Sequence, residues 1–539
     1  MIEFIRKNLK AAAFAGIPLF MLYFILRTFS QFEYFKLDPD QCTYLAIART
    51  FPFHKLYNND LFLIHQPLYC LIIGALSYVI PLFKAGLAVS IIFSILNFFL
   101  IRKMADMISL NKAGTLAALL YLSLNVPLIV TGSQVSRINI LIFFIGMSIY
   151  YFQKYLLTMG KKYLARTLIF NSLSLLCSDQ ALLLLIAQCI QFIVHAKFSS
   201  TWKALLKIMV LSVLVYSIWP LIRLYFYMTN PHYPAGIDGT VEFFTRINLA
   251  EILQPNNLPL TKYYRSFYTS TSFSPANFNI NKFLLVPTSI MFISKTYSII
   301  VVSFLVLISS IFAVLRRDKA VLTLLLISFV LYYPCVVGMY FWYGLPFIVP
   351  FSLLIGKAVH YLTEKLALPD KGVMLSEIAI ALILSALWMF GYCKSEINTP
   401  LQPSGGTHFL FLRKPITSGE SSIKNLPDDK DAGYLAPIGI VNEAIYLSGK
   451  RFIALPYYYE LLDVLIKEYK IKYIWFSGEM FRRFTEERGN FISGKDIVRR
   501  IASEPDKFEK VGEWREEYPD CYPPEVFFLY RVKSGETEH

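Results

Sequence analysis

Residues 34–60 read YFKLDPDQCTYLAIARTFPFHKLYNND, and the stretch HQPLY (65–69) follows closely. This loop separates the first two apolar segments of the chain, so Asp38 and Asp40 stand just beyond a segment of membrane length. A charged group at a bilayer surface is costly unless it faces water, a partner or a substrate. The two carboxylates are therefore the first candidates for chemistry in this sequence.

Composition places the chain in a membrane. Of its 539 residues, 55% are hydrophobic and 17% are charged, and the mean hydropathy is +0.49. A soluble protein of this length would expose far too much apolar surface, so the sequence indicates an integral membrane protein. The net charge of +15 comes with Lys and Arg clustered in short loops between apolar runs, a pattern that sets membrane orientation and argues against nucleic acid as a partner.

The apolar segments predict an α-helical, polytopic membrane protein with about 11 to 13 transmembrane helices. We expect about eleven full crossings, at residues 11–26, 86–101, 113–131, 138–157, 164–177, 181–194, 205–227, 287–315, 320–338, 343–362 and 373–392. A further apolar run, 67–82, is shorter and has Pro81 near its end.

Basic residues decide whether segment 67–82 crosses. Arg6, Lys7 and Lys10 place the N-terminus in the cytoplasm. If 67–82 dips into the membrane and returns, or lies along its surface, the later basic clusters also fall inside, whereas a full crossing would put them all outside. We therefore predict a partial segment. The later clusters contain Arg102, Lys103, Lys112, Lys154, Lys161, Lys162, Arg166, Lys197, Lys203, Lys207, Arg316, Arg317, Lys319, Lys365 and Lys371.

This topology divides the chain into two domains. Residues 1–393 form a multi-pass membrane core with a first outer loop at 30–66 and a long outer loop at 228–286. Residues 394–539 contain strand-like runs (RFIALP, IKYIWFS, VFFLYRV) around a helix-like YYYELLDVLIKEYK, so we expect a small extracytoplasmic α/β domain.

The residues alone leave two roles open for Asp38 and Asp40. A carboxylate at the interface can act as a general base on an acceptor hydroxyl, or help to hold a divalent cation beside a phosphate. Alternatively, these acids only cap a helix that begins near Thr43, stabilised by its dipole.

The stretch LDPDQCTYLAIARTF, with KLYNND and HQPLYCLIIGAL after it, resembles the first outer loop of GT-C glycosyltransferases. It is most similar to the branch of protein O-mannosyltransferases and aminoarabinose transferases (family 39-like), where a short helix reads roughly Asp-Glu-x-x-Tyr-x-x-x-Ala-Arg. The match at Tyr44, Ala48 and Arg49 places the catalytic aspartate of that branch on Asp40. Gln41 stands where the branch has glutamate, so a second carboxylate would have to come from elsewhere.

The resemblance also implies the site residues. Asp40 and Asp38 are the expected catalytic residues, and Asp40 with Asp60 would hold a divalent metal if one is bound. The expected substrate-binding residues are Arg49, Tyr57, Asp60 and His65 from the first loop, and Arg137, Arg246, Lys262 and Arg265 as candidate cations for a donor phosphate.

The function implied by the resemblance is inverting transfer of a sugar, a hexose or a pentose, from a polyprenyl-phosphate donor. The acceptor would be a lipid, a glycan or a protein at the outer face of a plasma membrane. Two alternatives share the hydrophobic architecture: a polytopic transporter or lipid flippase with an outer accessory domain, and a polymerase or ligase of cell-surface polysaccharide. No cofactor is certain beyond the optional metal.

Overall fold

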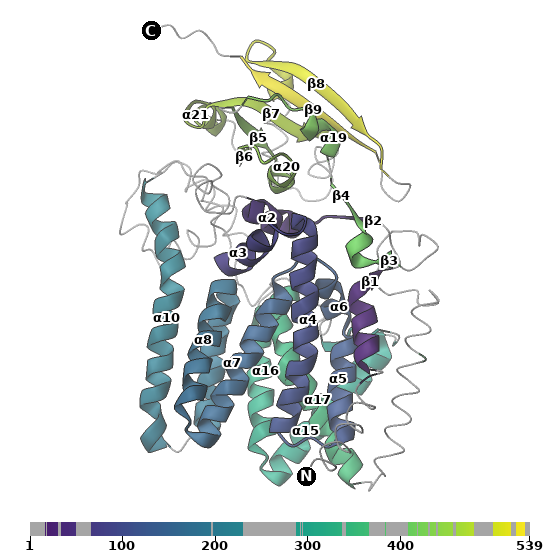
Figure 1. The fold of residues 1–539 in the computed structure, drawn as a ribbon, viewed down its shortest axis with the longest axis vertical. Coiled ribbons are helices and arrows are strands. Elements are labelled where there is room, and N and C mark those ends of the chain that lie inside the picture. Colours follow the sequence, from purple (N-terminus) through teal and green to yellow (C-terminus); the bar gives the residue numbers. More distant parts are fainter. Residues whose placement is uncertain are drawn as a thin grey trace.

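The computed structural model describes residues 17, 19–30, 34–49, 66–195, 198–229, 287–291, 293, 295–336, 341–365, 383, 408–417, 419–429, 432–437, 440–455, 460–478, 500–518 and 524–533. These residues form a bundle of long helices with a mixed α/β domain stacked on one end (Figure 1). We call this end of the bundle the domain-side end.

Within the described part of the chain, five helices are long and apolar enough to cross a membrane by length and composition, so this is a multi-pass membrane protein. They lie in α4 (Leu82–Met107), α7 (Ile138–Thr158), α10 (Phe198–Thr229), α15 (Lys295–Arg316) and the segment Gly344–Lys365, which contains α17 (Ile348–Lys365). Shorter apolar helices accompany them: Leu19–Thr28, α5 (Lys112–Leu124), α9 (Leu182–His195) and α16 (Lys319–Val336). The less apolar helix α8 (Lys161–Cys177) packs against α7.

Most predicted crossings coincide with these helices, and two details differ from the simple prediction. The run 113–131 is not one helix, because α5 ends at Leu124 and α6 (Val126–Gly132) begins after Asn125, which caps both helices. The Asn125 side chain accepts a hydrogen bond from the Leu128 amide, and Pro127 occupies the first turn, both typical of a helix start. The predicted crossing at 373–392 lies outside the described residues, except for residue 383.

The segment that was predicted to cross only partly forms α3 (Pro67–Leu76), a helix of 10 residues. Such a helix is about 15 Å long, half of the roughly 30 Å of a hydrocarbon core. It lies at the domain-side end of the bundle, beside α2 (Pro39–Arg49) and above α8 (Figure 1). After α3 the chain exposes Tyr78 and Val79 and enters α4.

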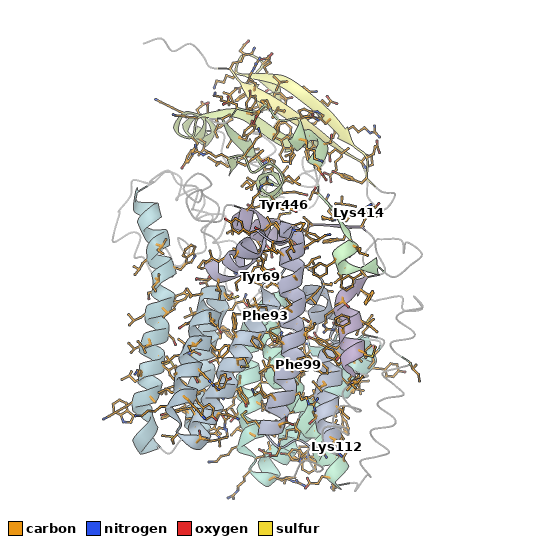
Figure 2. The ribbon with its side chains drawn as sticks, viewed as in Figure 1. Tyr69, Phe93, Phe99, Lys112, Lys414 and Tyr446 are labelled. Atoms are coloured by element: carbon orange, nitrogen blue, oxygen red, sulfur yellow. The ribbon has the colours of Figure 1, made fainter. Side chains whose placement is uncertain are left out.

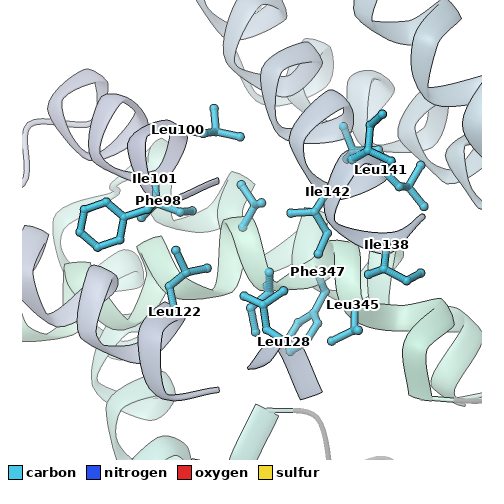
Figure 3. Packing of buried hydrophobic residues seen from close by; sticks show 14 of the residues in the cluster. Phe98, Leu100, Ile101, Leu122, Leu128, Ile138, Leu141, Ile142, Leu345 and Phe347 are labelled. Atoms are coloured by element: carbon cyan, nitrogen blue, oxygen red, sulfur yellow. The ribbon is translucent and has the colours of Figure 1, made fainter. Parts of the chain in front are cut away.

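Apolar side chains from many helices fill the bundle, among them Phe98 of α4, Leu122 of α5 and Ile142 of α7 (Figure 3). Two glycines let α5 and α17 approach closely. A Cβ atom on Gly114 would lie 2.6 Å from the carbonyl oxygen of Gly356, and the reverse holds for Gly356. Small residues at helix crossings are the usual packing solution in membranes.

The C-terminal domain is built on a five-stranded sheet in the order β6-β5-β7-β9-β8. Its strands are β5 (Gly433–Ala436), β6 (Phe452–Ala454), β7 (Ile471–Ser477), β8 (Phe508–Glu516) and β9 (Glu525–Val532). Strand β5 is parallel to β6 and β7, and β9 is antiparallel to β7 and β8. Helices α19 (Glu420–Lys424), α20 (Val441–Ser448) and α21 (Glu460–Glu468) complete this α/β domain.

Short strands tie the first loop to the start of this domain. Strand β1 (Phe29–Ser30) pairs antiparallel with β3 (His408–Phe409), and β2 (Tyr34–Lys36) pairs parallel with β4 (Lys414–Ile416). The loop that carries the two aspartates is thus held by the domain immediately before α2 begins.

Candidate active site

The two aspartates of the first loop have different structural roles. Helix α2 begins at Pro39, four residues earlier than the expected start near Thr43. Asp38 directly precedes it, and its Oδ1 accepts a hydrogen bond from the Gln41 amide at 2.8 Å. This is the geometry of a helix N-cap, with proline favoured at the first helical position. The capping role therefore belongs to Asp38.

Gln41 joins this cap to the membrane core. Its side chain is only 2% exposed, and its Nε2 donates to Asp38 Oδ2 at 2.9 Å. Its Oε1 accepts a hydrogen bond at 3.1 Å from the backbone amide of Val135, in the turn between α6 and α7. The site requires one donor and one acceptor on the same side chain, which glutamine supplies and an ionised glutamate does not. This accounts physically for the departure from the family pattern.

Asp40 takes no part in the cap. Its side chain is exposed, and among the residues that the structure describes no group donates a hydrogen bond to it. The protein around Asp40 desolvates its carboxylate and raises its pKa above the ordinary value, and the negative charge of Asp38 adds to this effect. The positive charge of Arg137 opposes it. Asp40 is thus reached by solvent on one side, while the protein on the other side desolvates its carboxylate enough to raise the pKa.

Helix geometry places Asp40 at a boundary between two surfaces. Tyr44, Leu45 and Ala48 of α2 pack into the core of the bundle, whereas Ala46 packs into the core of the C-terminal domain. With 100° of rotation per residue, Asp40 falls at the edge of the bundle-facing side. Asp40 thus stands on a helix that packs against both the membrane core and the outer domain.

Arg137 brings a positive charge to this region from the bundle. It is 7% exposed and occupies the N-cap position of α7, where the helix dipole adds further positive potential. Its guanidinium lies 5.8 Å from the ring centre of Tyr44, and that ring packs edge-on against Tyr69 of α3 at 5.2 Å. Figure 2 labels Tyr69 below α2 and above the body of the bundle. The N-terminus of α7, α2 and α3 thus converge.

The start of α3 is anchored to the turn between α8 and α9. Gln66, which is 1% exposed, donates from Nε2 to Asp179 Oδ1 at 2.5 Å. The hydroxyl of Tyr216 on α10 donates to the same oxygen at 3.1 Å. Asp179 lies in a short 3-10 turn (Asp179–Ala181), and its contacts link the start of α3 with α10. No sequence signal pointed to these partners, which are 113 and 37 residues away.

Arg49 lies at the last turn of α2, against the C-terminal domain. Its guanidinium donates to the backbone carbonyls of Tyr446 and Leu447, the latter at 2.9 Å. Both carbonyls belong to the last turn of α20. The described contacts of Arg49 are therefore with the outer domain, and its expected role in substrate binding stays a prediction.

Several expected site residues lie outside the described part of the chain: Tyr57, Asp60, His65, Arg246, Lys262 and Arg265. Their proposed roles, including a metal site with Asp60, stay predictions. Among the residues that are described, no three His, Cys, Asp or Glu side chains gather to hold a metal ion.

The sequence matches no protein-family model and no curated protein. The structure, in contrast, is similar to crystal structures of ArnT from Cupriavidus metallidurans. The ArnT structure bound to undecaprenyl phosphate aligns with a TM-score of 0.50 over 96% of this chain and 97% of ArnT, at 10% sequence identity. The apo structure aligns with a TM-score of 0.42 and 9% identity, covering 97% and 98% of the two chains. The chain therefore has the fold of ArnT, from its first helix to its C-terminal sheet, in agreement with the GT-C-like fold that its first loop predicts.

Proposed function

We propose that this protein is a membrane glycosyltransferase that moves a sugar from a polyprenyl-phosphate donor to an acceptor hydroxyl, with Asp40 as general base. The observation that carries the proposal is the position of Asp40. It is an exposed carboxylate with a raised pKa, facing the charge of Arg137, in a chain with the fold of a protein that binds undecaprenyl phosphate. Asp38 supports it by capping the same helix.

The charge pattern supports an extracytoplasmic position for this site. Lys112, at the start of α5, lies at the end of the bundle far from the domain (Figure 2). At the same end Arg316 pairs with Glu364 at the end of α17, and the Asn111 amide donates to His360 of that helix. Basic residues concentrate on the cytoplasmic side of membrane proteins. We therefore place the N-terminus in the cytoplasm and the C-terminal domain outside the plasma membrane.

The proposed reaction uses the negative charge of Asp40 and the positive charge of Arg137. The acceptor hydroxyl gives its proton to the Asp40 carboxylate, while its oxygen forms a bond with the anomeric carbon of the donor sugar. The bond from that carbon to the phosphate oxygen breaks, and polyprenyl phosphate leaves from the opposite face with the bonding electrons, so the anomeric centre is inverted. A base with a pKa moved toward neutrality is better matched to this proton transfer than an ordinary aspartate.

Arg137 is suited to stabilise the leaving phosphate. Its charge is buried and hence weakly screened, and it acts at Asp40 through space. A positive charge at a helix N-terminus stabilises a phosphate that gains negative charge as it leaves. Arg246, Lys262 and Arg265 remain further candidates for direct contact with this phosphate.

The test is sugar transfer by the purified full-length chain in proteoliposomes, with a labelled polyprenyl-phosphate sugar as donor. Asp40→Asn should lower kcat by about 10²- to 10⁴-fold, the usual contribution of general acid–base catalysis. Asp428→Asn is the matched control, because that carboxylate is 93% exposed in the C-terminal domain and should leave transfer unchanged.

Undiminished transfer by Asp40→Asn contradicts the assignment of the base. Movement of the labelled lipid across the bilayer by the wild-type chain, without a new glycosidic bond, would instead favour the transporter alternative.

A further inference from the structure

We propose that Arg49 is a positioning residue that locks the C-terminal domain onto helix α2 and thereby holds Asp40 in place. The proposal rests on the proposed function for its catalytic consequence, because it assumes that Asp40 is the base. Its structural part, the lock between Arg49 and α20, stands independently and can be measured without turnover.

Helix α2 is held between two bodies. One side packs through Tyr44, Leu45 and Ala48 into the bundle, and Ala46 packs into the core of the C-terminal domain. A helix of 11 residues is marginal in water by itself, so its order depends on these contacts. Removing one of the two surfaces should therefore loosen the helix that carries Asp40.

Arg49 makes the polar part of the domain-side contact. The last carbonyls of α20 have no partners within their own helix and form the negative end of its dipole. The guanidinium of Arg49 donates to two of them, those of Tyr446 and Leu447. A positively charged donor at a helix C-terminus both satisfies the unpaired carbonyls and interacts favourably with the helix dipole.

Gly449 of the C-terminal domain leaves space for the Arg49 guanidinium. Gly449 ends α20 with a φ of +66°, a conformation that side chains other than glycine rarely adopt. A Cβ atom there would lie 3.0 Å from Nε and 3.2 Å from Nη2 of Arg49. Glycine at this position thus both ends the helix and leaves room for the arginine. A second polar contact lies on the same interface, where Asn442 donates to the hydroxyl of Thr43 at 2.6 Å.

Arg49 lies too far from Asp40 to contact its carboxylate. The two residues are nine positions apart on one helix, which corresponds to about 13 Å along the axis and to opposite sides of it. In this proposal Arg49 influences the reaction through α2. Asp40 lies near the start of α2, and Arg49, which contacts the C-terminal domain, lies at its end.

The experiment compares Arg49→Ala, Arg49→Lys and Gly449→Ala in the full chain. Arg531→Ala is the control, because it removes an exposed ion pair with Glu509 elsewhere in the same domain. Two quantities are measured: hydrogen exchange of the backbone amides of α2, and the kinetics of sugar transfer from a polyprenyl-phosphate sugar.

For Arg49→Ala we expect exchange in α2 to become at least about tenfold faster, as local opening becomes easier. We expect kcat to fall by about 10- to 100-fold with little change in the donor KM, because a misplaced base lowers reactivity more than binding. Arg49→Lys should have a higher kcat than Arg49→Ala, because it keeps the positive charge. Gly449→Ala, which changes the C-terminal domain instead of α2, should lower kcat as Arg49→Ala does. The control should change neither quantity.

The pH profile adds a readout that a merely structural role would not move. Loosening α2 exposes Asp40 to water and removes part of the desolvation that raises its pKa. The acid limb of kcat in Arg49→Ala should therefore shift to lower pH. If the backbone amides of α2 exchange at the wild-type rate in both Arg49→Ala and Gly449→Ala, Arg49 does not hold the C-terminal domain on α2. Faster exchange with unchanged kcat would overturn its catalytic role. If the wild-type chain transfers no sugar, the proposed function fails, while hydrogen exchange still decides the lock.

Discussion

Replacing Gln41 with glutamate, the residue of the related family, should destabilise this protein strongly at neutral pH. The Gln41 amide donates to Asp38 Oδ2 at 2.9 Å, from a side chain that is 2% exposed. A glutamate carboxylate would face the Asp38 carboxylate at the same place, with no proton to donate. The contact would change from a charge-assisted hydrogen bond, worth about 1.5–3 kcal/mol, to a repulsion between like charges.

The magnitude has an upper bound, because the glutamate can take up a proton. Once protonated, its O–H can donate to Asp38 and restore the bond. At pH 7, protonating a group with an ordinary pKa of about 4.3 costs roughly 1.36 kcal/mol for each of about 2.7 pH units, or about 4 kcal/mol. At pH 5 the same cost is only about 1 kcal/mol. The folded-state pKa of the new carboxyl is raised, so the penalty grows with pH above the unfolded-state pKa and disappears below it.

The assay is thermal or denaturant unfolding of the purified chain in detergent at pH 5 and pH 7, followed by intrinsic fluorescence. Gln41→Met is the matched control, since it removes both hydrogen bonds of the side chain without adding charge. Its penalty should be similar at the two pH values. Equal stability of Gln41→Glu and wild type at pH 7, or a loss of stability that does not shrink toward pH 5, would refute the hydrogen bond from Gln41 to Asp38.

Three further perturbations test other parts of the site. Arg137→Gln removes the positive charge that opposes protonation of Asp40, so the acid limb of kcat should move to higher pH and donor KM should rise. Asp38→Ala removes both the cap of α2 and the acceptor of the buried Gln41 amide, so the unfolding free energy should fall by more than the roughly 1 kcal/mol of a cap alone; a loss below the error of the measurement would argue against both contacts. Arg27→Ala leaves two buried carbonyls without the donors at 2.8 and 3.0 Å that the fully buried arginine supplies, so folded protein should decrease sharply in a detergent-solubilisation assay.

The membrane architecture could be predicted from the sequence because it depends on local composition. Runs of apolar residues predicted the helices, and the short run at 67–82 forms the 10-residue helix α3, whose position in the membrane stays a prediction. The break at Asn125 also had a local signal, Asn-Val-Pro, which a count of hydropathy passes over.

The roles within the first loop could be predicted only in part. The resemblance favoured Asp40 over Asp38 as the base, which stays a prediction. The cap made by Asp38 could not be predicted, because it depends on where α2 begins. Gln41 looked like a missing carboxylate, because its partner Val135 is 94 residues away. Arg49 matched a family motif, yet its partners lie 397 and 398 residues away in another domain. Contacts between such distant segments leave no periodic pattern in one sequence.

In the proposed reaction, a lipid-linked sugar reacts between Asp40 and Arg137. The most direct measurement is a structure of the full chain with a polyprenyl-phosphate sugar, in the Asp40→Asn form that should trap the donor. We predict density for the phosphate near the N-terminus of α7, within about 4 Å of a basic side chain, with the anomeric carbon facing residue 40. Density for the phosphate at the opposite end of the bundle, beside Lys112 and Arg316, would contradict it.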